Sequence, residues 1–211
     1  MTFQQAINNF GLDRLINGFI SHIEISIIVL AICLVIGVPL GIFAAKNKVT
    51  TQIVLGTANL MKVIPSLAIM VMLVSITGAG MIPAICALVL LGLPPIMVNT
   101  CLGIRNVDPH TIEAARGIGM DSRMVLYKIQ IPLSFPMMMT GIRTSAVMIV
   151  ACTTMAYYAG GGGLGTSIAY GLSMHINPLL LTGSLLVAGI TAIVDQLFAR
   201  LQERVNKKYS M

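Results

Sequence analysis

The chain has 211 residues, of which 56% are hydrophobic and only 9% are charged, and its mean hydropathy is +0.91. Water-soluble domains carry about 25% charged residues, so this composition excludes a soluble globular fold and makes lipid the solvent for most of the surface. The formal net charge of +6 does not indicate nucleic-acid binding, because the basic side chains lie in short segments between apolar runs.

Uncharged runs long enough to cross a membrane recur along the chain and predict about five spans. An α-helix needs about 20 apolar residues to cross about 30 Å of hydrocarbon. The expected spans are residues 20–45, 50–77, 81–104, 136–159 and 178–198. We therefore predict an all-α integral membrane protein that forms a single transmembrane domain over residues 1–211.

Two features stand out within these spans. Pro94 and Pro95 interrupt the third, and because broken backbone exposed to lipid is not tolerated, the expected break should face protein or a water-filled path. Lys62 is the basic residue predicted to lie within the second span. It either meets the carboxylate of a zwitterionic solute or extends to the polar membrane surface or a partner subunit, and the second interpretation is favoured.

Residues 105–135 differ from the rest of the chain because they carry four basic and three acidic side chains. Asp108, followed by a proline, is typical of a helix start, Gly119 of a helix end and Asp121 of the start of a second short helix. By their spacing, Ala115 and Gly119 share a face of the first helix, where small side chains permit close approach of a partner. The pattern predicts a helix-turn-helix loop, which either couples the spans to a soluble partner or simply connects them.

The distribution of lysine and arginine predicts the orientation. With five spans and the amino terminus outside, the basic turn at 46–48, the loop at 105–135 and the basic tail from Arg200 all face the cytoplasm, and only Arg14 is clearly outside. We expect a multi-pass membrane protein with its amino terminus outside and its carboxyl terminus in the cytoplasm.

A glycine run lies between the last two predicted spans. A phosphate-binding loop is rejected, because no lysine follows the glycines and the predicted topology places them outside. Glycine permits backbone conformations and close packing that other residues do not. We predict an outer gate or re-entrant turn, with a flexible hairpin as the alternative. The predicted gate residues are Gly160, Gly161, Gly162, Gly163 and Gly165.

Three tyrosines, Tyr157, Tyr158 and Tyr170, flank the glycine run. Aromatic faces attract quaternary ammonium groups, but tyrosines also gather at membrane interfaces, and the interface interpretation is favoured.

The loop at 105–135 resembles the EAA loop of the permeases of ATP-binding-cassette importers. That pattern reads Glu-Ala-Ala, three residues, Gly, nine residues, Ile, one residue, Leu-Pro. This chain matches it at Glu113, Ala114, Ala115, Gly119, Ile129 and Pro132, and has Ile131 where the family favours Leu. The resemblance implies the fold of a type I ABC importer permease and a location in the bacterial plasma membrane. The implied ATPase-coupling residues are Glu113, Ala114, Ala115, Arg116 and Gly119.

Residues 64–68, 141–143 and 160–172 resemble the branch of this family that imports glycine betaine, carnitine, choline and related osmoprotectants. The candidates for the solute path are Lys62, Pro65, Ser66, Tyr157 and Tyr158. The resemblance implies two permease subunits, identical or different, paired around the path, with cytoplasmic ATPase subunits under the loops and an extracellular binding protein delivering the solute. ATP and Mg would be bound by the ATPase, so we expect no cofactor, metal or catalytic site in this chain.

Two alternatives stay open. The permeases of methionine-type amino-acid importers share the general pattern. A stand-alone channel or secondary carrier is less favoured, because such carriers usually contain internal repeats and none is convincing here. An enzyme is disfavoured because no cluster of His, Cys or carboxylate residues suits catalysis.

Overall fold

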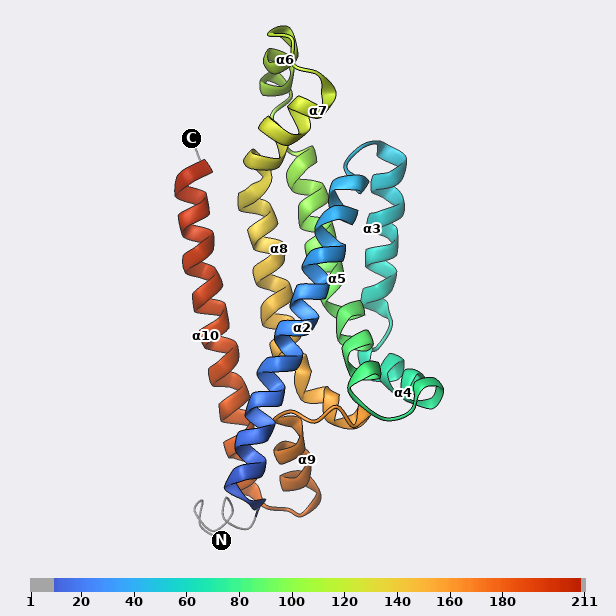
Figure 1. The fold of residues 1–211 in the computed structure, drawn as a ribbon, viewed down its shortest axis with the longest axis vertical. Helices are drawn as coiled ribbons and strands as arrows, with labels where there is room; N and C mark the ends of the chain where they lie inside the picture. The colour runs from blue at the N-terminus through green and yellow to red at the C-terminus, as the bar shows by residue number, and fades with distance from the viewer. Residues whose placement is uncertain (1–9, 210–211) are drawn as a thin grey trace. The chain divides into compact units, whose positions relative to one another are not determined.

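The structure is a computed structural model that describes residues 10–209, and every regular element in these residues is helical (Figure 1). The α-helices are α2 (Leu12–Ala44), α3 (Lys48–Val63), α4 (Ser66–Thr77), α5 (Met81–Arg105), α6 (Pro109–Gly117), α7 (Ser122–Val125), α8 (Ile131–Cys152), α9 (Gly165–Ser173) and α10 (Asn177–Tyr209). A π-helical turn (Leu126–Gln130) precedes α8, and a 3₁₀ segment (Thr153–Ala159) follows it.

Four described helical stretches are long and apolar enough to cross a membrane, and there are five if α3 and α4 count as one bent span. The predicted fold class, an all-α membrane protein with about five transmembrane helices, is confirmed.

The second expected span, residues 50–77, is divided into α3 and α4 by a break at Ile64 and Pro65. Proline lacks a backbone N–H and disfavours helical backbone at the residue before it, which explains a break at this point. Lys62 lies in the last turn of α3 and is exposed, where a cation also interacts favourably with the helix dipole.

The break expected in the third span does not occur, because α5 continues through Pro94 and Pro95. Both prolines are buried, as expected for residues that face protein. Prolines inside a spanning helix are tolerated when neighbouring helices pack around the locally weakened backbone.

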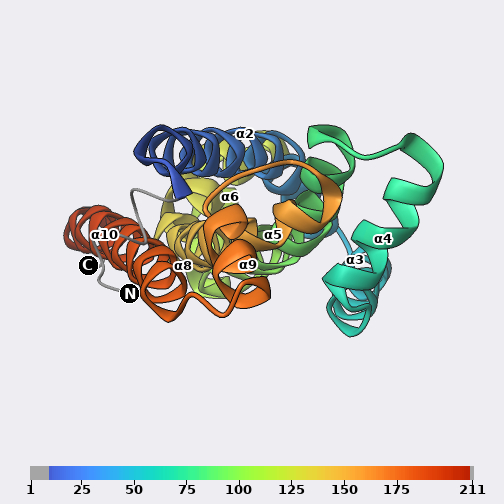
Figure 2. The ribbon, with the colours of Figure 1, turned by 90° about the horizontal axis from the view of Figure 1, so that it is seen from below.

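Residue contacts divide the chain into two compact units, and the long helices contribute to both. The first unit comprises residues up to Ile32, Lys62–Gly92 and Ala146–Asp195. Its apolar core joins the start of α2 to α10 through Leu15, Leu164, Leu179 and Val187. The short helix α9, which was not predicted, lies between the glycine run and α10 (Figure 2). Nine residues give too few turns for its apolar periodicity to stand out from an uncharged surrounding sequence.

The second unit comprises Cys33–Met61, Leu93–Ser145 and the chain from Gln196 onward. Glycines set the distance between its helices. A Cβ atom on Gly41 of α2 would lie 2.5 Å from Cβ of Thr100 in α5, and one on Gly141 of α8 would lie 2.6 Å from Cβ of Asn99. Small residues at helix contacts allow the backbones to approach closely, which is a main source of packing energy in membranes. The prediction that both units form one transmembrane domain stays a prediction.

Candidate functional site

The first element of the charged loop, α6, is held at its start by a side-chain cap. The carboxylate of Asp108 accepts hydrogen bonds from the His110 backbone N–H (3.2 Å) and the Thr111 hydroxyl (3.2 Å), and Pro109 occupies the first helical position. The predicted helix start is thereby confirmed. The hydrogen bond from His110 N–H, more than any other cause, holds the pKa of the Asp108 carboxyl below its usual value, so the cap is charged at neutral pH.

The end of α6 is closed by Gly119, as predicted. Its φ of +88° lies in the region that favours glycine, and its N–H donates to the Arg116 carbonyl at 2.9 Å, while Met120 N–H donates to the Ala115 carbonyl at 3.1 Å. Asp121 then caps the next turn by accepting from Met124 N–H at 2.7 Å, which confirms the second predicted start. Two side-chain caps and a glycine stop therefore fix the shape of this loop.

The coupling residues implied by the resemblance do not share one surface. Glu113, Ala114, Arg116 and Gly119 are exposed, whereas Ala115 is buried within its own unit. The expected face shared by Ala115 and Gly119 is therefore wrong. The reason is that α6 ends at Gly117, before the spacing that places these two residues on one face is complete.

Sequence reasoning missed Ile118, whose side chain is 78% exposed at the end of α6. The sequence did contain a signal for it, since this isoleucine directly precedes the predicted helix end in a charged loop. A large apolar side chain at such a position has no nearby core to enter and is expected to be exposed. An exposed apolar side chain rimmed by charged residues is typical of a protein contact.

The glycine run has the conformations for which glycine is needed. Gly160, Gly162 and Gly163 have positive φ angles of +77°, +83° and +83°. Gly165 is required for a different reason, because a Cβ atom there would collide with the carbonyl oxygen of Thr154. The run thus folds back tightly against the 3₁₀ segment, and its function as an outer gate stays a prediction.

A buried polar network lies beside this run. His22 Nε2 lies 2.9 Å from the Val150 carbonyl, the Ser26 hydroxyl donates to the His22 carbonyl at 2.7 Å, and the hydroxyls of Ser26 and Thr153 are 3.1 Å apart. A Cβ atom on Gly163 would lie 3.6 Å from His22 Nδ1. These contacts connect α2 to the end of α8, where the glycine run follows, and sequence reasoning gave no signal for them.

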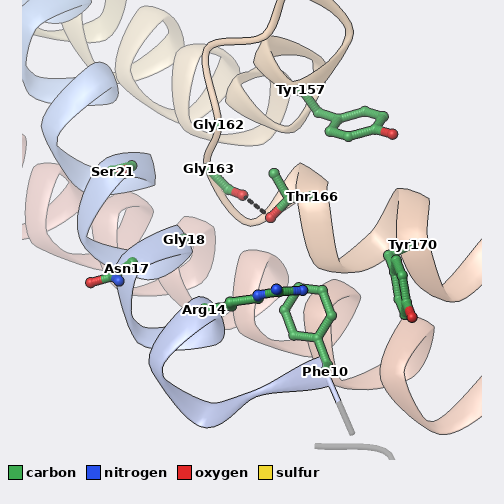
Figure 3. A pocket seen from close by; sticks show the side chains of 10 residues that line it. All are labelled: Phe10, Arg14, Asn17, Gly18, Ser21, Tyr157, Gly162, Gly163, Thr166 and Tyr170. Carbon is green, nitrogen blue, oxygen red and sulfur yellow. Dashed lines mark hydrogen bonds between the residues drawn. The ribbon is translucent and has the colours of Figure 1, made fainter.

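A cavity of about 420 Å³ opens where the glycine run meets the start of α2 and α9 (Figure 3). Tyr157 and Tyr170 lie on one side of it and Arg14 on the other, and the Thr166 hydroxyl closes one wall by donating to the Gly163 carbonyl at 2.8 Å. The lining residues are Phe10, Arg14, Asn17, Gly18, Ser21, Tyr157, Gly162, Gly163, Thr166 and Tyr170. One cation, three aromatic rings and several neutral polar groups suit a small polar or zwitterionic molecule.

The structure brings together only some of the predicted solute-path residues. Tyr157 lines the cavity, and Tyr158 is exposed with its ring centroid 5.4 Å from that of Tyr157. The Ser66 hydroxyl contacts Met155 Sδ at 3.5 Å, which places the start of α4 beside the 3₁₀ segment. Pro65 and Lys62 are exposed and do not line this cavity.

Comparison with known proteins gives a consistent result. Residues 37–208 match the family described as the binding-protein-dependent transport system inner membrane component. The carnitine transport permease protein OpuCB of Listeria monocytogenes is 35% identical over 187 residues, covering 89% of this chain and 86% of that protein. The glycine betaine/carnitine/choline transport system permease protein OpuCB of Bacillus subtilis is 34% identical with the same coverage. The osmoprotectant import permease protein OsmW of Salmonella typhimurium is 35% identical over 186 residues, 86% of each chain.

Solved structures share the fold at lower identity. A chain of the MetNI methionine ABC transporter in an inward-facing conformation gives a TM-score of 0.79 at 19% identity, covering 92% of this chain and 97% of that one. An amino acid ABC transporter crystallised with histidines gives 0.73 at 17% identity, covering 99% of both chains. At these identities the likeness shows the fold alone.

Proposed function

The chain belongs to the family of binding-protein-dependent transport system inner membrane components and is a transport permease, and we propose that it imports an osmoprotectant such as glycine betaine, carnitine or choline. The family and the type I importer permease fold, both predicted from the EAA-like pattern, are confirmed. The substrate proposal is supported by the names of curated relatives at 33–35% identity. The likeness to methionine and other amino-acid transporters is one of fold, so it gives the amino-acid alternative weaker support.

The observation that carries the coupling role is the exposed end of α6. Glu113, Arg116, Ile118 and Gly119 are all exposed in a loop segment whose shape is fixed by its caps, and an ATPase subunit can bind such a rigid, partly apolar segment. ATP and Mg would be held by that ATPase, so closure of its nucleotide sites would displace α6.

Movement of α6 can be passed on through continuous helices. The loop is joined to α5 by Asn106–Asp108 and runs through α7 and the π-helical turn directly into α8. The 22 residues of α8 extend about 33 Å and lead into the 3₁₀ segment and the glycine run. A packed helix transmits displacement because its core contacts are not continuously deformable. The glycine run would thus act as the outer gate.

The remaining parts of the proposal follow the charge distribution and the size of the chain. The amino terminus lies outside and the carboxyl terminus in the cytoplasm, since the exposed cations of the 46–48 turn, the α6 loop and the end of α10 then share the cytoplasmic side. About five spans are few for a gated path, so a second permease subunit completes it and an extracellular binding protein delivers the solute. The cavity at Arg14 and Tyr157 would then face outward, where the solute enters.

Reconstitution tests this function. The chain would be co-expressed with an ATPase and a binding protein from the same organism, purified and placed in liposomes, and uptake of radiolabelled glycine betaine, carnitine, choline and methionine would be measured. We expect uptake of a quaternary ammonium solute that requires ATP and the binding protein, and none with an ATPase variant unable to hydrolyse ATP. Uptake without the ATPase would instead indicate a secondary carrier, and uptake of methionine alone would indicate the amino-acid alternative.

A further inference from the structure

A second cavity, of about 390 Å³, lies within the second unit between the end of α2, the end of α5 and the α6 loop. Its lining residues are of two kinds. The apolar ones include Ile42, Leu126, Ile104 and Val125, of which the last two are each 2% exposed. The polar and basic ones are Lys46, Arg116, Ser122, Arg123 and Gln130.

The charge of this cavity is unbalanced. Lys46, Arg116 and Arg123 come from three different segments, and no carboxylate lines the cavity beside them. Within residues 10–209, none of the three forms an ion pair, although the ammonium of Lys46 lies 5.1 Å from the centroid of the Phe43 ring. The neighbouring carboxylate of Asp121 is occupied in capping Met124 N–H at 2.7 Å. All three cations are exposed, so water and salt screen their mutual repulsion, and a bound anion would add direct charged hydrogen-bond partners.

The chemistry of the lining favours a phosphate group. Two guanidinium groups supply planar pairs of donors that match phosphate oxygens, Lys46 adds a compact positive charge and Ser122 a hydroxyl donor. Gln130 is less available, because its amide already donates to the Ile104 carbonyl at 3.5 Å.

The apolar surface that leads to this cavity indicates where the phosphate comes from. Leu40 and Phe43, on the last turns of α2, do not line the cavity but are 39% and 50% exposed, and the Phe43 ring lies 5.1 Å from the ammonium of Lys46, which does line it. Hydrocarbon chains can lie along these two residues while a headgroup enters the cavity at Lys46. A soluble phosphate compound would gain nothing from this apolar approach, whereas a phospholipid would.

We propose that this cavity binds the phosphate of an anionic phospholipid headgroup at the membrane surface next to the α6 loop. The bound headgroup holds the end of α2, through Lys46, together with Arg116 of α6 and Arg123 of α7. The site attaches the α6 loop to the lipid surface and leaves the end of α6 with Ile118 exposed. The proposal rests on the proposed orientation only in assigning this surface to the cytoplasmic leaflet.

Native mass spectrometry of the full-length chain in mild detergent, titrated with phosphatidylglycerol, tests the proposal. The variant Lys46→Gln with Arg123→Gln removes two of the three cations. We expect it to reduce lipid occupancy by about tenfold or more, because two of the three charged donors to the phosphate would be lost. The matched control is Lys48→Gln with Lys128→Gln, which removes two exposed cations of the same unit that do not line the cavity and should leave occupancy unchanged. Lys46→Arg with Arg123→Lys should restore most of the binding.

Further measurements distinguish a lipid phosphate from a soluble phosphate compound and from an acidic surface of a partner protein. Displacement of the lipid by glycerol 3-phosphate at equal concentration would overturn the proposal, because it would assign the site to a soluble phosphate compound. Equal phosphatidylglycerol occupancy in the wild type, the variant and the control would overturn the proposal. So would a variant that keeps its lipid but loses association with the ATPase, since that would assign the cations to an acidic surface of the partner. The lipid measurement needs neither ATP nor solute, so its outcome is independent of the proposed transport function.

Discussion

Gly119→Asp is expected to reduce ATP-driven uptake by roughly thirtyfold, equivalent to about 2 kcal/mol of lost binding to the ATPase. The residue is exposed at the end of α6 and a Cβ atom there meets no other atom within 4 Å, so the side chain itself has room, but the φ of +88° adds backbone strain that a control variant must match. The new carboxylate would directly follow exposed Ile118 in the chain, within the proposed ATPase contact, where an unpaired negative charge is costly. Uptake in liposomes and the amount of ATPase that co-purifies measure the effect.

Gly119→Asn is the matched control for this prediction. Asparagine has the shape of aspartate without its charge, and both side chains tolerate the positive φ of +88° better than other non-glycine residues. We expect Asn to retain most of the uptake and ATPase association. Equal loss in both variants would mean that the backbone of this turn, and not a docked surface, is what the substitution disturbs. Normal uptake by the Asp variant would contradict the proposed coupling role of this turn.

Gly165→Ala is expected to destabilise the first unit by about 3 kcal/mol, a large fraction of the stability of a protein of this size. The added methyl group would collide with the Thr154 carbonyl and would lie 3.1 Å from Cβ of Tyr157. The colliding oxygen belongs to the backbone of the 3₁₀ segment, so no side-chain rotation relieves the overlap. Thermal unfolding of the purified chain in detergent should show a lower midpoint, and the amount inserted in the membrane should fall.

Gly189→Ala provides the comparison for this second prediction. Gly189 lies inside α10, and a Cβ atom there meets nothing within 4 Å. Alanine is about 1 kcal/mol better than glycine in a helix interior, so this variant should unfold at the same temperature as the wild type or slightly above it. If the two alanine variants unfolded at the same temperature, the tight approach of the glycine run to the 3₁₀ segment would be disproved.

Local sequence chemistry was sufficient for the ends of α6. An aspartate that accepts a backbone N–H, a proline at the first helical position and a glycine with positive φ act over three or four residues, so Asp108, Gly119 and Asp121 could be assigned without a fold. The same reasoning failed for Pro94 and Pro95, because a proline in a helix is judged by what packs around it, and both are buried.

The candidate cavities could not be predicted for a related reason. Arg14 and Tyr157 are 143 positions apart in the sequence, and Lys46 and Arg123 are 77 apart. Tyr157 was a candidate for the solute path, but the basic residues entered only as part of the charge pattern, because nothing in the neighbouring sequence indicates which residues lie across from them. Likewise, His22 had no feature that distinguished it from an exposed histidine before its contact with the Val150 carbonyl was known.

By itself the sequence determined the class of solvent, the approximate spans, the family and the shape of the exposed loop, because hydrophobic length, helix caps and the EAA-like spacing are properties of consecutive residues. Only the tertiary structure decided that Ala115 turns inward while Ile118 projects, that Gly165 has no room for a methyl group, and that three cations meet in one cavity. These features depend on the close approach of helices distant in sequence, and in a chain that is apolar on almost every face the hydrophobic pattern does not specify which faces meet.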